Sequence, residues 1–516
     1  MRIAAFDLGS NSFHLLVVDA QPDGSFVALG REKEMLRLGD VVTREGRVPP
    51  AAAARAIDTV RRFKAIADSA GAEEIAACAT AAIREAENGG ELVDRIYAET
   101  GVRVRLLSGR EEARLVFQAV RASVVIDPGP ALCLDLGGGS LEVTVGGQTG
   151  MLRAASVELG VARLTAELVR HDPPSTNDIR RLRERVTAVL APVADEMATL
   201  HPAMAVGTSG TICDLARMAA SHRTGAVPAS LNQLTVRRED LLGVQDAILS
   251  TPASRRTRMP GLDPRRADQI PAGSMVLTTA MELFGFNELT VSEWALREGI
   301  ILDLISRWDP AEWSGDTHDI RRRAVLHLAR RCNWDEAHAR QVARLSTRLF
   351  DLTAPLHGLG DDDRELLDYA ALLHDIGHHV SIESHHKHTC YLIQNGRLRG
   401  FDHEEVDALA AVARYHRRAD PKPSHEPFAS LDADRQRRVT ALASLLRIAD
   451  GLDFGHSGSV DDLDVSVGKA AVKIRASGID DLELELWGAR RKRQLFEKVF
   501  ERRLEIVEER ASRRAG

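Results

Sequence analysis

The sequence predicts a mixed α/β protein with a duplicated strand–turn–strand unit, followed by an all-helical domain and a small α/β tail. The duplication rests on DLGSNS at residues 7–12 and LDLGGGS at residues 134–140, each of which ends an apolar run. From about residue 310, helical apolar spacing replaces strand signals. Because 516 residues are too many for one hydrophobic core, several domains are expected.

The first half alternates strands and helices. Three strands are expected in residues 2–33, with the sequences RIAAFDL, FHLLVVDA and SFVALGRE. Pro49 and Pro50 open an amphipathic helix that ends near Gly71. The strand IAACAT, a helix from Asn88, the strand VRVRLLSG and the helix REEARLVFQAV follow.

The second half repeats this plan. ALCLDLGGGSLEVTVGG predicts a second hairpin, and LRAASVEL predicts a further strand. Helices near residues 160–170 and 176–200, the strand MAVGTSGT and the helix ICDLARMAA come next. Duplication is expected to place the two hairpin tips across a cleft, each presenting an aspartate and backbone N–H groups.

The remaining chain divides into a helical part and a tail. Candidate helices include DEAHARQVARLSTRLFDL, RELLDYAALLHDI and RQRRVTALASLLRIADGL. In the tail, LDVSVGKAAVKIRA and DLELELWG are expected to be strands, RRKRQLFEKVFE a helix and RRLEIVEE a last strand. The predicted domains are residues 1–125, 126–308, 309–460 and 461–516.

Composition limits the class of protein. With 44% hydrophobic and 28% charged residues the chain is globular, and a formal charge of -7 argues against nucleic-acid or membrane-surface binding by the molecule as a whole. Five scattered cysteines fit a reducing compartment. With no signal peptide and no run approaching about 20 apolar residues, a cytoplasmic protein without a membrane span is expected.

The two hairpin tips are candidate phosphate-binding loops, because glycine lets the backbone approach an anion closely. The candidate donors are Gly9, Ser10 and Asn11 in the first tip and Gly137, Gly138, Gly139 and Ser140 in the second. Asp7 and Asp135 offer hard oxygen ligands suited to Mg²⁺. Either tip alone could be an ordinary glycine turn, but the repetition argues for a site.

A third loop, Gly207-Thr208-Ser209-Gly210-Thr211, follows a strand and opens a helix. Gly207, Ser209 and Gly210 are therefore candidate phosphate ligands at a helix N-terminus, although the loop could also be a simple cap.

Hydrolysis also needs a carboxylate that activates water, and Glu111 and Glu112 begin a helix after VRVRLL. Adjacent helical residues point about 100° apart, so only one can face the site. Spacing does not decide between them, and both could be first-turn acids matched to the helix dipole.

Six ordered motifs together resemble the exopolyphosphatase and guanosine pentaphosphate phosphohydrolase family. They are FDLGSNSFHLLV, T-x-x-x-R at residues 80–84, LLSGREEARLVF, CLDLGGGSLEV, VGTSGTI and SEWALREGII. They cover residues 2 to about 305, and the rest resembles the family's long form. The resemblance implies two ribonuclease H-like halves of the actin-like ATPase superfamily and an HD-type helical domain.

The resemblance also implies roles for individual residues. Glu112 would be the water-activating base, and Arg84 would hold the terminal phosphate. Asp7, Asp135 and Glu142 would manage Mg²⁺. Phosphate oxygens would be held by residues of the three loops, among them Asn11, Gly137, Gly138, Ser140, Ser209 and Gly210.

The implied reaction is Mg²⁺-dependent, stepwise release of orthophosphate from the end of inorganic polyphosphate, by a homodimer. Guanosine pentaphosphate is the alternative substrate, and the helical domain favours polyphosphate. Two other classes stay open: a kinase-like enzyme on the same fold, and a non-catalytic sensor of polyphosphate or guanosine tetraphosphate.

The helical domain carries a second candidate centre, signalled by His338, His374, Asp375, His416 and Asp450. The H…HD…D pattern of His338, His374, Asp375 and Asp450 resembles that of HD phosphohydrolases. Such residues from separate helices could bind a transition metal and even carry the activity, or the domain could be only a scaffold. The histidine-rich run at residues 378–388 is either a solvated loop or a contact for polyphosphate.

Overall fold

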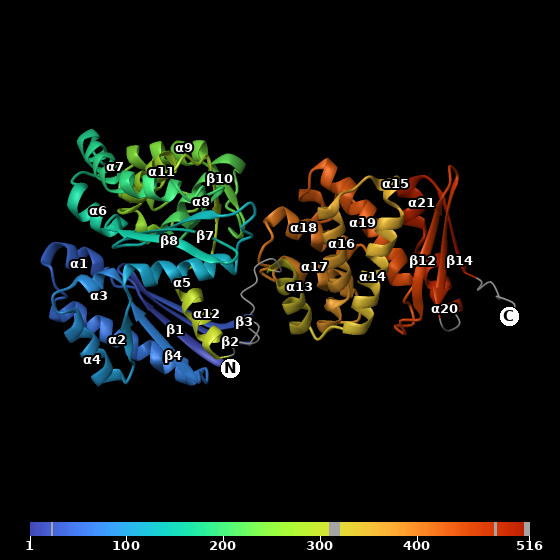
Figure 1. Cartoon of the computed structure of the whole chain (residues 1–516), viewed down its shortest axis with the longest axis horizontal. Coiled ribbons are helices and arrows are strands. Elements are labelled where there is room, and N and C mark those ends of the chain that lie inside the picture. Colours follow the sequence, from blue (N-terminus) through green and yellow to red (C-terminus); the bar gives the residue numbers. More distant parts are fainter. Residues whose placement is uncertain (22–23, 309–319, 479–481, 510–516) are drawn as a thin grey trace. The chain divides into compact units, whose positions relative to one another are not determined.

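The protein, described here by a computed structural model, forms two compact units, residues 1–320 and 321–516 (Figure 1). The structure describes residues 1–21, 24–308, 320–478 and 482–509. Within these ranges, no helix combines the length and apolar character needed to cross a membrane.

The first unit begins with a five-stranded sheet of order β3-β2-β1-β4-β5. Strands β1 and β2 form an antiparallel hairpin, and β4 runs parallel to β1. The strands are β1 Arg2–Leu8, β2 Ser12–Ala20, β3 Phe26–Met35, β4 Glu74–Ala79 and β5 Val104–Leu106. The helices are α1 Leu38–Glu45, α2 Pro50–Ser69, α3 Ala81–Glu85, α4 Gly89–Thr100 and α5 Gly109–Arg121. The three expected N-terminal strands are thus confirmed, whereas the short helix α1 was not anticipated.

A second sheet of order β10-β11-β9-β6-β7-β8 repeats this core, with β6 and β7 as the hairpin and β9 parallel to β6. Its strands are β6 Ala131–Leu136, β7 Leu141–Gly147, β8 Gly150–Val157, β9 Met204–Thr208, β10 Thr235–Arg237 and β11 Glu288–Val291. The helices are α6 Val161–Leu168, α7 Thr176–Ala198, α8 Gly210–Thr224, α9 Arg238–Ser250, α10 Ala253–Arg256, η1 Pro264–Arg266, α11 Ile270–Leu283 and α12 Leu296–Trp308. The predicted duplication is confirmed.

The two halves of the first unit exchange helices. α5 follows the first sheet in sequence but packs on β7 and β8, while α12 packs on β1, β2 and α5. The helices α5 and α12 pack closely at Gly299 of α12. A Cβ atom there would lie only 2.1 Å from the carbonyl oxygen of Leu115 in α5. A shared hydrophobic cluster joins the two halves. Helices thus pack across the predicted boundary between residues 125 and 126. The boundary itself stays a prediction.

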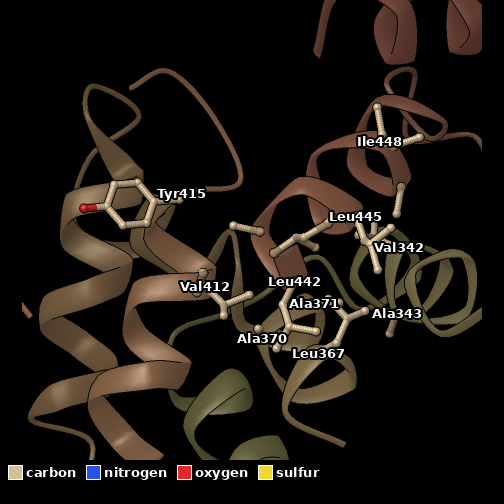
Figure 2. Close-up of a cluster of buried hydrophobic side chains, with 14 of the residues drawn as sticks. Val342, Ala343, Leu367, Ala370, Ala371, Val412, Tyr415, Leu442, Leu445 and Ile448 are labelled. Carbon is tan, nitrogen blue, oxygen red and sulfur yellow. The ribbon is translucent and has the colours of Figure 1, made fainter. Parts of the chain in front are cut away.

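The second unit is helical around one core. Its helices are α13 Ile320–Arg331, α14 Glu336–Leu352, α15 Ala354–His357, α16 Asp361–Leu373, η2 Ile376–His379, α17 His385–Gln394, α18 His403–Arg414, η3 Phe428–Ser430 and α19 Ala433–Gly451. Figure 2 shows part of this core, where Val342, Leu367, Val412 and Leu445 come from four of these helices. This arrangement fixes the helices whose ends carry the histidines described below.

The tail adds β12 Val460–Val467, β13 Ala471–Gly478, α20 Glu483–Lys492, α21 Gln494–Phe500 and β14 Arg503–Glu508. The strands form a three-stranded sheet of order β12-β13-β14 that shares the hydrophobic core of the helices. The predicted boundary at residue 460 stays a prediction.

The expectation of a strand at DLELELWG was wrong, because its described part lies in and just before the helix α20. The alternating leucines suggested a strand, but burial follows helical spacing. Leu482, Leu486 and Ala489 are buried, whereas Leu484 is 48% exposed. Leucine and glutamate are also better helix formers than the β-branched residues that favour strands.

Candidate active site

The tips of the two hairpins meet. A Cβ at Gly139 would lie 2.9 Å from Ser10 Oγ, and one at Gly138 would lie 3.2 Å from Asn11 Cγ. These glycines are therefore required by the close approach of the first tip. Ser10 Oγ also accepts a 3.1 Å hydrogen bond from the backbone N–H of Ala82, at the start of α3. The structure thus brings the two predicted phosphate loops together.

Four carboxyl groups face one another behind these tips. Asp7 and Asp135 are the next-to-last residues of β1 and β6, and Glu142 opposes Asp135 across the second hairpin. Glu112 comes from the first turn of α5. Asp7, Asp135 and Glu142 each raise the pKa of Glu112, which shows that the four carboxyl groups form one cluster.

Burial and mutual repulsion favour the neutral forms of these acids. Burial raises the pKa of Asp7 to about 7; Arg297 opposes this shift and Glu298 adds to it. Burial, then Glu142 and Asp135, hold the pKa of Glu112 well above its usual range. Burial also raises the pKa values of Asp135 and Glu142. Carboxyl groups with raised pKa values in one place are typical of a site that binds a cation or handles protons.

The structure separates the two candidate bases. Glu112 is buried in the cluster, with Oε2 3.5 Å from a guanidinium nitrogen of Arg84. Glu111 instead makes a 2.7 Å ion pair with Arg105, a half-exposed side chain. Arg84 is held by a 2.6 Å hydrogen bond to the carbonyl of Leu107. Only the second glutamate of the pair is thus placed with the other acids.

The donor set fits Mg²⁺. Glu112 Oε2, Glu142 Oε2 and Asn11 Oδ1 are buried and accept no hydrogen bond. The other oxygen of Glu142 accepts a 2.7 Å bond from the Ser156 hydroxyl, which orients the carboxyl group. Mg²⁺ prefers carboxylate and phosphate oxygens together with water, so Asp7, Asp135 and Glu142 form a suitable set.

The third loop lies beside this cluster, since Thr208 pairs with Asp135 on the neighbouring strand. Ser209 adopts a φ of 92°, a strained value that is common at functional loops, and its hydroxyl caps α8. Arg266 packs directly over Gly210. Gly207 lies within β9, and a Cβ there would be 2.7 Å from Leu289, a placement that favours a packing role.

Sequence reasoning missed several charged residues near the first tip. His14 lies opposite Asp7 in the first hairpin and contacts Ser12 Oγ at 2.7 Å and Arg297 at 3.1 Å. Burial, then Arg297, keep the pKa of His14 well below its usual range, so the ring is neutral. The other side chains that lower this pKa are Lys33, Arg266 and Arg265. The seven-residue spacing from Asp7 to His14 matches that from Asp135 to Glu142 and could have identified His14.

Comparison with known proteins agrees with this geometry. Residues 17–308 match the Ppx/GppA phosphatase family, and residues 320–473 match Ppx/GppA phosphatase, domain III. The chain belongs to the Ppx/GppA phosphatase family. The resemblance seen in the sequence is confirmed, and the protein is a Ppx/GppA hydrolase whose first unit has two α/β halves of repeated topology.

Two relatives of this Ppx/GppA protein carry different enzyme names. Exopolyphosphatase 1 of Mycobacterium tuberculosis is 37% identical over 306 residues, which are 58% of this chain and 88% of that protein. Guanosine-5'-triphosphate,3'-diphosphate pyrophosphatase of Aeromonas hydrophila is 28% identical over 450 residues, which are 86% of each protein. The second relative matches a longer stretch at lower identity.

Two solved structures are similar to about 60% of this Ppx/GppA protein. An exopolyphosphatase from Cytophaga hutchinsonii has a TM-score of 0.56 at 28% identity and covers 60% of this chain and 98% of its own. The Ppx/GppA family member of Aquifex aeolicus has a TM-score of 0.52 at 27% identity, with coverages of 60% and 98%.

Domain III brings together the second set of predicted residues. His338 Nε2 lies 3.2 Å from His374 Nε2 and 3.8 Å from Asp450 Oδ1, and Asp375 lies beside both histidines. His338, His374 and Asp450 have ligand atoms close enough to hold one metal ion. In the run at residues 378–388, His385 and His386 are buried and Lys387 is exposed, so this run is not a fully solvated loop.

Proposed function

We propose that this Ppx/GppA protein is an exopolyphosphatase that releases orthophosphate from the end of inorganic polyphosphate with Mg²⁺. The observation that carries the proposal is the buried Glu112 carboxyl beside Arg84, within a cluster of three further carboxyl groups behind two glycine tips. This arrangement offers a base, a cation for the terminal phosphate and a place for a metal ion.

Each residue of this site has a separate proposed role. Glu112 would orient the attacking water and accept its proton, a role for which its raised pKa is suited. Arg84 would bind the terminal phosphate and stabilise the charge that develops on its oxygens. Asp7, Asp135 and Glu142 would hold Mg²⁺, which neutralises phosphate charge when bound. Backbone N–H groups of the two tips would bind the remaining oxygens.

Cations near the first tip support a polyanionic substrate. Lys33, Arg265, Arg266 and Arg297 are near enough to His14 to lower its pKa, and they come from β3, η1 and α12. Such a group could hold phosphates beyond the terminal one. The higher identity to proteins named exopolyphosphatase also supports polyphosphate.

The test is phosphate release from long-chain polyphosphate and guanosine pentaphosphate in parallel, with Mg²⁺. We expect kcat/KM to be at least about 10-fold higher for polyphosphate, equal to about 1.4 kcal/mol of transition-state binding. The reverse ratio would establish the second candidate, a guanosine pentaphosphate phosphohydrolase, which the long match to the Aeromonas protein favours.

The same assay separates the other classes. Transfer of phosphate from ATP to an added acceptor would indicate a kinase, and binding of polyphosphate without turnover would indicate a sensor. Activity abolished by His374→Ala but retained in Glu112→Gln would move the reaction to domain III. A homodimer and a cytoplasmic location without a nucleic-acid partner stay predictions.

Asp7 should make the metal-free protein less stable as pH rises. Its pKa is raised from 3.8 to about 7, so the folded protein keeps a proton that the unfolded chain has released. Stability therefore falls between about pH 4 and pH 7 and levels off above that, by up to about 4 kcal/mol at 1.36 kcal/mol per unit. Urea unfolding in EDTA at pH 5 and pH 8 measures the part of this loss that lies above pH 5, about 2.7 kcal/mol.

Asp7→Asn is the matched comparison, because it removes the titrating group and keeps its shape. The difference in unfolding free energy between wild type and Asp7→Asn should change with pH in this window. A pH-independent difference would contradict the prediction. Because Mg²⁺ binds the ionised carboxylate, its affinity in the wild type should rise as the pH approaches 7.

A further inference from the structure

Domain III contains more metal-binding side chains than one ion needs. Six of them converge from α14, the α16–η2 junction, α17, the end of α18 and α19: His338, His374, Asp375, His385, His416 and Asp450. The four histidine side chains are at most 4% exposed. The predicted metal set of His338, His374, Asp375 and Asp450 contains neither His385 nor His416, and the proposed function does not use them.

Asp375 faces two sets of ligands with its two oxygens. Its Oδ2 lies 3.9 Å from His338 Nε2 and 3.6 Å from His374 Nε2. Its Oδ1 lies 3.1 Å from His385 Nε2 and 3.4 Å from His416 Nε2. Oδ1 is buried yet accepts no hydrogen bond of good geometry. One carboxylate therefore stands between two groups of imidazoles.

The imidazoles present lone pairs to one another. His374 Nδ1 lies 2.7 Å from the carbonyl of Ala371, and His416 Nδ1 lies 2.7 Å from the carbonyl of Ala413. A carbonyl only accepts, so each Nδ1 carries the proton and each Nε2 is left with a lone pair. This is how neighbouring groups fix the tautomer of a metal-binding histidine.

The same histidines form two close pairs of ring nitrogens. His374 Nε2 is 3.2 Å from His338 Nε2, and His416 Nε2 is 3.2 Å from His385 Nε2. Because His374 Nε2 and His416 Nε2 each hold a lone pair, either the partner nitrogen carries a proton or a metal ion lies between the two. His338 is held from its other side, since its Nδ1 lies 2.7 Å from Asp453 Oδ2. Each pair is thus a place where a metal ion could replace a shared proton.

We propose that domain III binds two divalent transition-metal ions that share the Asp375 carboxylate and together bind a phosphate group. The first ion takes His338, His374 and Asp450. The second takes His385 and His416. Imidazole with carboxylate suits such ions better than Mg²⁺, and paired ions about 3.5–4 Å apart that share ligands are a recurring phosphate-binding arrangement.

Cationic side chains at this centre favour an anionic ligand. Lys492, on α20, pairs with Asp450 Oδ2, and an Arg417 guanidinium nitrogen lies 3.2 Å from His385 Nε2. Ions bound to Asp450 and His385 would release these two cations. The Asp375 side chain is 18% exposed, so the centre is open to solvent on that side. The ligand class is a phosphate monoester or diester, with inorganic phosphate as its simplest form.

Manganese binding to the full-length protein tests the pair. We expect an exchange-coupled Mn²⁺ pair in the EPR spectrum, beside any isolated ion bound by the first unit. His416→Ala should lose one ion per chain and the coupling. His403→Ala, at a half-exposed histidine of α18, is the matched control and should keep both. Circular dichroism and the Tm report folding of each variant.

These metal-binding measurements test the proposed metal pair independently of polyphosphatase activity. No coupled pair in the wild type, or both ions retained with coupling in folded His416→Ala, would overturn it. Glu112→Gln should show the wild-type pair, so failure of the proposed function and failure of this centre are distinguishable.

Inorganic phosphate tests the ligand. Millimolar phosphate should change the coupled spectrum of the wild type, and Lys492→Gln should weaken this effect about 10-fold. Because only the coupled signal is followed, phosphate bound to the first unit does not contribute. A coupled spectrum that phosphate leaves unchanged would refute phosphate binding by the pair.

Discussion

Glu112→Gln should lower phosphate release from polyphosphate by about 10³-fold, because a positioned general base contributes about 10²–10⁴-fold. Glutamine keeps the shape of the side chain but cannot accept the proton of the attacking water. Steady-state kinetics should place the loss in kcat, with KM nearly unchanged, since Arg84 and the two glycine tips would still bind the phosphate chain.

Glu111→Gln is the matched control for this substitution. Glu111 is the neighbouring residue on α5, but it pairs with Arg105 away from the other acids. Its replacement should leave kcat within about two-fold of wild type, because surface ion pairs contribute little. Turnover that survives in Glu112→Gln, or is lost equally in both variants, would remove Glu112 from the reaction.

The Glu112 carboxyl also shows why sequence-based prediction stopped where it did. A helical pattern predicts that Glu111 and Glu112 point in different directions. Only the packing of α5 on the second sheet decides which of them faces the other carboxyl groups of the site. Burial then favours the neutral carboxyl group, and removing it should raise the stability of the metal-free protein above neutral pH.

The fold could be predicted from the sequence more fully than the site. The hairpins were predictable because apolar runs end on Asp and Gly at the same spacing in both halves. The helix α20 was not, because its alternating leucines imitate a strand until packing selects helical spacing. Arg297 was missed for a different reason: it reaches Asp7 and His14 only because α12 packs back on the first sheet.

Histidines in domain III show the same limit. The pattern that suggested His338, His374, Asp375 and Asp450 depends on order along the chain, and it contains no place for His385. The structure brings both His385 and His416 beside Asp375, because α17 packs against α18 and η2. When several helices contribute the ligands of one site, the sequence shows only that the domain is rich in histidine. It does not show which histidines come together.

Arg84→Ala should reduce kcat/KM for polyphosphate by about 10²–10³-fold, because it removes the positive charge that lies 3.5 Å from the proposed base and would bind the terminal phosphate. The variant should also shift the pH profile. Arg84 lowers the pKa of Glu112, so its loss raises that pKa further, and the rise of activity with pH should move to higher pH.

Arg84→Lys and Arg105→Ala make this prediction specific. Lysine keeps a charge but loses the two-pronged guanidinium, so Arg84→Lys should fall between wild type and Arg84→Ala in kcat/KM. Arg105 pairs with Glu111 and is 42% exposed, so Arg105→Ala should change neither kcat/KM nor the pH profile. An Arg84→Ala enzyme with an unshifted profile would mean that Arg84 and Glu112 do not act together, and Arg84 would then have to be assigned to substrate binding alone.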